Sequence, residues 1–172
     1  MPQRPSLTFT KCAENLPPTS NVFVVGMQQP DDVVDLIYQG HRVSIIDKCT
    51  DAFSAAGFYL EEKKLDSEIL IIKGDFVKTI LAENAFDALI SDGYLSDQTM
   101  LDELDSFVKK ASAILKSGAH LYFRATGKNV DETLLRKTFG KDFHIREFSY
   151  EPDGSQDMQH QSVSLIAQKP VI

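Results

Sequence analysis

The chain has 172 residues, of which 42% are hydrophobic and 25% are charged, and its formal net charge is −7. This length predicts one domain with a core of its own. The acidic balance disfavours unaided binding of nucleic acid, which needs a basic surface. Cys12 and Cys49 form neither a disulfide framework nor a metal-ligand pattern, so we expect a reduced, cytoplasmic protein without a metal site. No segment resembles a signal peptide or a membrane span, so no membrane association is expected.

Residues 1–20 contain four prolines and no sustained periodicity, so they predict an N-terminal arm in front of a domain over residues 21–172. In this domain, apolar runs that predict strands alternate with helical patterns. The expected parallel strands are Val22–Val25, Arg42–Ile46, Ile69–Ile72, Phe86–Ile90 and His120–Phe123. The expected helices are Asp31–Gln39, Asp51–Lys63 after a Thr50 cap, Val77–Glu83, Asp97–Lys116 between Ser96 and Gly118, and a last helix from Asn129 to Gly140.

Two strand-like runs end the chain, Phe143–Tyr150 and Ser162–Gln168, and the segment between them carries the turn signal Asp153-Gly154. Consecutive strands without a crossover helix pair antiparallel. The continuous apolar run Ile69–Ile72 is typical of a parallel strand that is covered on both faces. The sequence therefore predicts a three-layer α/β/α sandwich, with a seven-stranded, mostly parallel sheet that ends in an antiparallel hairpin.

The stretch Asn21–Asp47 carries the clearest functional signal. Its pattern is strand, loop, helix and strand, with Gly26 at the first turn and Asp47 directly after the second strand. Open α/β sheets bind ligands at the carboxyl ends of their strands, and an acid about 20 residues beyond the glycine turn can accept hydrogen bonds from ribose hydroxyls. The pattern indicates a nucleotide-binding unit.

Five parallel strands followed by a terminal hairpin resemble the class I S-adenosylmethionine (SAM) dependent methyltransferases over nearly the whole chain. The segment Gln39–Val43 that leads into Asp47 is similar to the branch containing thiopurine and tellurite-resistance methyltransferases. A nicotinamide-dependent oxidoreductase also fits the first unit, but that class does not normally end in such a hairpin.

The resemblance implies SAM as cofactor and methyl transfer to an unknown acceptor. It implies that Asp47 binds the ribose hydroxyls, that Asp75 contacts the adenine amino group, and that Asp92 lies beside both donor and acceptor. Tyr94 would line the acceptor pocket, and Asp92 and Tyr94 are the candidate catalytic residues. The other implied cofactor residues are Gly26, Met27, Gln28, Lys48 and Phe76.

The glycine loop departs from the family pattern. Val24 stands where the family has an acid, and Gln28 and Pro30 stand where it has glycines. Proline cannot adopt a positive φ and donates no N–H, and Asp31 with Asp32 places negative charge where the donor carboxylate would bind. A catalytically inactive methyltransferase-like binding or scaffold subunit is therefore the alternative. The short chain leaves an open site, which suits a bulky acceptor, a second copy of the chain or a protein partner.

Overall fold

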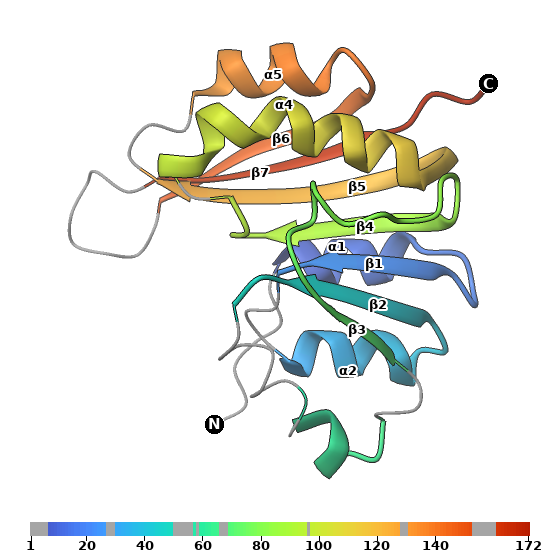
Figure 1. The fold of residues 1–172 in the computed structure, drawn as a ribbon. Helices are drawn as coiled ribbons and strands as arrows, with labels where there is room; N and C mark the ends of the chain where they lie inside the picture. The colour runs from blue at the N-terminus through green and yellow to red at the C-terminus, as the bar shows by residue number, and fades with distance from the viewer. Residues whose placement is uncertain are drawn as a thin grey trace.

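The computed structural model describes residues 7–26, 30–49, 57, 59–65, 69–95, 97–127, 131–152 and 161–172. Within them one seven-stranded sheet has the order β3-β2-β1-β4-β5-β7-β6 (Figure 1). The strands are β1 Asn21–Val25, β2 Arg42–Asp47, β3 Ile69–Lys73, β4 Phe86–Asp92, β5 Leu115–Gly127, β6 His144–Pro152 and β7 Gln161–Gln168. Strands β1 to β5 are parallel, and β7 lies antiparallel between β5 and β6. The predicted mixed sheet with its terminal hairpin is confirmed.

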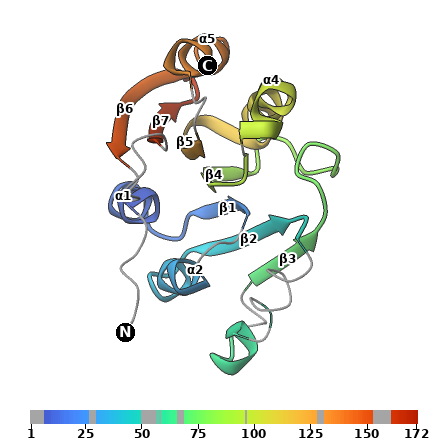
Figure 2. The same cartoon turned by 90° about the vertical axis from the view of Figure 1, so that its left-hand side faces the viewer.

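Helices cover both faces of this sheet. They are α1 Leu7–Asn15, α2 Pro30–Tyr38, α4 Asp97–Ile114 and α5 Glu132–Phe139. Figure 2 shows α1 and α2 on one side of the sheet and α4 on the other. The helix α1 lies inside the predicted arm, where the sequence reading expected no helix, and it packs Phe9 and Cys12 against the sheet. The three-layer architecture is therefore confirmed.

Strand β1 divides the core between the two layers by simple alternation. Val22 and Val24 pack in the cluster that contains α1 and α2 residues, whereas Phe23 and Val25 pack in the cluster of α4 and α5. Successive side chains of a strand point to opposite faces, so an apolar run without polar interruption is required wherever both faces are covered.

Two predictions on either side of Gly74 are wrong. Strand β3 lies at one edge of the sheet. Its Leu70 is 58% exposed, so the strand is not covered on both faces. The predicted helix Val77–Glu83 is replaced by turns. The Asp75 side chain accepts hydrogen bonds from the Val77 and Lys78 N–H groups, and the Thr79 hydroxyl donates to the Asp75 carbonyl. With the Thr79 N–H, which donates to the same carbonyl at 3.0 Å, these bonds form one capped turn that does not continue as a helix.

Helix ends also differ from their predicted positions. Helix α4 ends at Ile114 rather than at Gly118, which lies inside β5 with φ +77°. Helix α5 is capped by Asp131, whose carboxylate accepts from the Thr133 N–H at 2.8 Å, and Gly140 ends it as predicted. Of the predicted helix Asp51–Lys63, residues 57 and 59–62 are helical, and residues 51–56 and 58 lie outside the described residues. The predicted caps Thr50, Ser96 and Asn129 also lie outside them.

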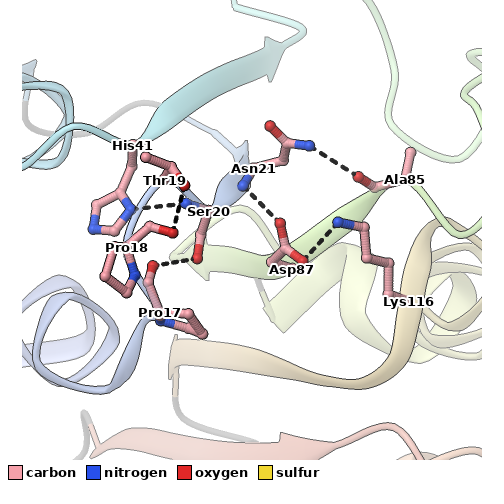
Figure 3. A network of polar contacts seen from close by, with 9 residues as sticks. All are labelled: Pro17, Pro18, Thr19, Ser20, Asn21, His41, Ala85, Asp87 and Lys116. Atoms are coloured by element: carbon pink, nitrogen blue, oxygen red, sulfur yellow. Dashed lines mark hydrogen bonds and ion pairs between the residues drawn. The ribbon is translucent and has the colours of Figure 1, made fainter.

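A polar network joins three strands at the amino edge of the sheet (Figure 3). The Asp87 carboxylate of β4 accepts from the Asn21 N–H at 2.8 Å and from the Lys116 ammonium at 2.7 Å. Beside it the Ser20 N–H donates to His41 Nδ1 at 3.3 Å, and burial lowers the pKa of His41. This edge is opposite to the carboxyl ends of the parallel strands, where the predicted site residues lie.

Candidate functional site

The carboxyl ends of β1, β2 and β3 are joined by backbone hydrogen bonds. The Gly26 N–H donates to the Ile46 carbonyl at 2.8 Å, and the Gly74 N–H donates to the Asp47 carbonyl at 3.0 Å. Gly26 has φ +80°, a conformation that glycine adopts without strain. The structure thus brings three predicted segments, around Gly26, Asp47 and Asp75, to one edge of the sheet.

Asp47 is held in place by a local turn. Asp47 is 8% exposed, and its Oδ1 accepts a hydrogen bond from the Cys49 N–H at 2.7 Å. The next residue, Lys48, reaches across the site: its ammonium lies 4.9 Å from the centre of the Tyr94 ring and 3.8 Å from Glu103 Oε2 on α4. The carboxylate is therefore fixed at the end of β2, and the ammonium of the next residue lies near the Tyr94 ring and Glu103.

Phe76 contributes its backbone to the site, because its ring is fully buried. The ring centre lies 5.9 Å from that of Phe23 and 5.1 Å from that of Phe107. The Phe76 N–H donates to the Tyr94 hydroxyl at 3.2 Å. Next to it, Asp75 Oδ1 accepts the Val77 N–H at 2.9 Å. A backbone donor and a carboxylate therefore lie side by side after β3.

Tyr94 lies over the turn at the end of β1. It follows Gly93, whose φ of +71° reverses the chain after β4. A Cβ atom added to Gly26 would lie 3.3 Å from both Cβ and Cδ2 of Tyr94, so the two residues are in close contact. Burial raises the pKa of the Tyr94 hydroxyl above its usual value, although the bond from the Phe76 N–H acts in the opposite direction.

Asp92 and two residues that the sequence reading did not select complete the site. Asp92 is 6% exposed, and the Arg124 Nη1 of β5 donates to its Oδ1 at 3.1 Å. Glu103 Oε2 is a buried oxygen that accepts no hydrogen bond within the described part of the chain. In the sequence, Glu103 could have been noticed because it falls on the same helical face as the apolar residues Met100 and Phe107 of α4. Arg124 differs from its neighbours only as a charged residue beside an apolar run.

The rest of the predicted loop is described only in part. Met27 and Gln28 lie outside the described residues. Helix α2 starts at Pro30, one residue before its predicted start, and Asp31 and Asp32 occupy its first turn. In the described ranges there is no group of three His, Cys, Asp or Glu residues that could hold a metal ion. In the same ranges, every helix is too short or too polar to span a membrane.

The chain matches no protein-family model, and no curated protein matches its sequence. Solved structures match its fold. The [4+2]-cyclase SpnF superposes with a TM-score of 0.79 at 14% identity, covering 95% of this chain and 80% of that one. A SAM-dependent methyltransferase from Methanosarcina mazei gives 0.73 at 16% identity, covering 94% and 98%. The N-methyltransferase NodS from Bradyrhizobium japonicum WM9, in complex with S-adenosyl-L-homocysteine (SAH), gives 0.74 at 18% identity, covering 94% and 84%.

The protein therefore has the class I fold of SAM-dependent methyltransferases. The match to a [4+2]-cyclase shows that this fold alone does not define the reaction. The function has to be argued from the residues at the carboxyl edge.

Proposed function

We propose that the protein binds SAM at the carboxyl ends of β1, β2 and β3 and transfers its methyl group to an acceptor. The observation that carries this proposal is the convergence of Gly26, Asp47 and Asp75 at adjoining strand ends. A nucleoside offers hydroxyl and amino donors, which two carboxylates at this edge can accept. The SAH-bound state of NodS, a protein of the same fold, supports the choice of ligand.

Each residue has a distinct role in this proposal. The Asp47 carboxylate accepts the ribose hydroxyls, with Lys48 beside it, and Asp75 with the Phe76 N–H receives the adenine base. Gly26, with Met27 and Gln28 next to it in the sequence, would hold the methionine end. When bound, SAM supplies an electrophilic methyl group that an acceptor lone pair displaces from sulfur. Asp92 and Tyr94 would then position the acceptor, which is the main requirement of such a displacement.

A second candidate is a catalytically inactive binding or scaffold subunit, and one observation favours it. The Tyr94 side chain packs against Gly26, so a protein group takes the position where glycine normally lets a ligand approach. Pro30, Asp31 and Asp32 at the start of α2 also suit the donor carboxylate poorly. In this case a protein partner or a second copy of the chain would use the open edge.

Two finer assignments belong to the proposal. The segment Gln39–Val43 before Asp47 supports a relationship with the thiopurine and tellurite-resistance methyltransferases. The terminal hairpin β6–β7 argues against a nicotinamide-dependent oxidoreductase, which would need only the first βαβ unit.

Thermal unfolding with and without SAM or SAH, checked by titration calorimetry, tests the proposal. Ligand at a hundred times its dissociation constant stabilises the folded state by about 2.7 kcal/mol, which raises the Tm by about 5–10 °C for a domain of this size. Asp47→Ala should abolish the shift. Glu83→Ala removes an exposed carboxylate at the opposite edge and should leave it intact. No shift at millimolar ligand, with NAD equally inactive, would exclude the enzyme and favour the scaffold.

A further inference from the structure

One side chain contacts two backbone positions that the proposed cofactor would need, one at its adenine base and one at its methionine end. The Tyr94 hydroxyl accepts the Phe76 N–H at 3.2 Å, after β3. The same residue lies against Gly26 after β1: a Cβ atom added to Gly26 would lie 3.3 Å from both Cβ and Cδ2 of Tyr94. Tyr94 therefore bridges the ends of two strands across the site.

The Phe76 N–H matters because of the chemistry of adenine. The Watson–Crick edge of adenine has an amino donor next to a ring-nitrogen acceptor. Asp75 can accept from the amino group, and the adjacent Phe76 N–H can donate to the ring nitrogen. In the structure this N–H already donates to Tyr94, so the base and the tyrosine hydroxyl compete for one donor.

The Tyr94 ring is held by contacts that can be broken while the core of the domain stays packed. The Lys48 ammonium lies 4.9 Å from the centre of the ring, and the Phe107 ring centre lies 6.4 Å away. Tyr94 itself is only partly buried, whereas the following residue, Leu95, is 1% exposed and anchors the chain. Rotation of the tyrosine side chain would leave this anchor in place.

We propose that Tyr94 is a gate of the nucleoside site. In the closed position its hydroxyl accepts the Phe76 N–H and its Cδ2 lies against Gly26. The nucleoside binds after the ring rotates away and then accepts the N–H, while Cβ of Tyr94 stays beside Gly26. The apparent affinity is then the intrinsic affinity multiplied by the open fraction. This inference rests on the proposed function, because it assumes that the site binds a nucleoside.

Titration calorimetry with SAH on Tyr94→Phe and Tyr94→Ala tests the gate. Tyr94→Phe keeps the ring and releases the Phe76 N–H, so it should bind SAH about fivefold more tightly, the equivalent of one net hydrogen bond. Tyr94→Ala also removes the ring and its Cδ2 contact with Gly26, leaving only the Cβ contact, and should bind more than about tenfold more tightly. Tyr38→Phe and Tyr38→Ala alter a tyrosine that is 67% exposed on α2 and should leave the affinity unchanged.

The outcomes separate the gate from the site. If the wild type binds SAH and both Tyr94 variants bind it with equal or lower affinity, the gate is rejected and the nucleoside site is kept. Binding by the variants alone would support both. No binding by any form would reject the proposed function, and the gate with it.

Amide exchange of Phe76, followed by NMR in the absence of ligand, provides a second readout that does not depend on affinity. The Phe76 N–H should exchange several-fold faster in Tyr94→Phe than in the wild type, because its hydrogen-bond acceptor is removed. Added SAH should restore its protection. Unchanged exchange in folded Tyr94→Phe would contradict the closed position.

Discussion

Asp92 and Arg124 face each other at paired positions of β4 and β5, and their side chains form an ion pair at 3.1 Å. The Asp92 side chain is 8% exposed and that of Arg124 is 30% exposed, so the pair is shielded mainly on the carboxylate side. This ion pair belongs to the same sheet edge as the candidate site and ties the end of β4 to β5 there.

Removal of the guanidinium should destabilise the protein more than removal of an ordinary surface cation. Arg124→Leu leaves a buried carboxylate without this donor, so the free energy of unfolding should fall by about 1–3 kcal/mol. Lys109→Leu breaks a pair whose side chains are 69% and 47% exposed, and its cost should be much smaller. Urea unfolding of both variants gives the comparison; equal costs would mean that the Asp92 pair is solvated.

Gly26 and Gly40 offer a matched pair for measuring the Tyr94 contact. Both have positive φ, +80° and +89°, but a Cβ atom at Gly40 would have no neighbour within 4 Å. Gly40→Ala should therefore cost about 1–2 kcal/mol for backbone strain alone, and Gly26→Ala should cost more because of the additional close contact with Tyr94. Thermal unfolding should show a smaller excess in the Gly26→Ala, Tyr94→Ala double variant, because the Cδ2 contact is removed while the Cβ contact remains; an undiminished excess would locate the strain elsewhere.

Lys169 ties the C-terminal segment to the end of α4. Its ammonium donates to the Ser112 carbonyl at 2.8 Å, the Leu115 carbonyl at 2.6 Å and Asn84 Oδ1 at 3.0 Å. Cations stabilise the carbonyl end of a helix, so Lys169→Met should lower the free energy of unfolding by about 1.5–3 kcal/mol. Lys78→Met, at an exposed position, serves as the control. A loss as small as that of the control would mean that water replaces these bonds.

The stability of the protein should decrease as the pH falls below about 6.5, in part because of His41. Burial lowers the pKa of His41 below 6.5, so His41 takes up its proton at a higher pH in the unfolded chain than in the folded protein. The stabilisation is fully present above pH 6.5, and it is lost as the pH falls from there to the lowered folded pKa. Urea unfolding as a function of pH should show a smaller decrease for His41→Gln. His120, whose pKa is also lowered by burial, accounts for part of the remainder.

The fold could be predicted where the chain carries continuous apolar runs. The bounds of β1, β2 and β4 were predicted within one or two residues because these strands are covered on both faces. The same signal was wrong for the coverage of β3, since an apolar run does not distinguish a central strand from an edge strand. The helix α1 was missed because it is short and lies between prolines, and its burial of Phe9 depends on the sheet it contacts.

Only the part of the candidate site that lies at strand ends could be predicted from the sequence. Gly26, Asp47 and Asp75 follow strands directly, so their meeting at one edge follows from parallel topology. Arg124 and Glu103 reach the site from β5 and α4, and no local pattern indicates such tertiary contacts. The Tyr94 hydroxyl bond to Phe76 likewise depends on how the chain turns after Gly93.

The network around Asp87 has a consequence for how this protein can change. Bonds from Asp87 to Asn21 and Lys116 secure β1, β4 and the start of β5 at the edge away from the site (Figure 3). Substitutions at well-separated positions without shared partners have nearly additive effects on stability. Residues at the ligand edge can therefore be exchanged with little effect on these anchoring bonds, so a lineage with this architecture could acquire a new ligand, or lose its old one, and still fold.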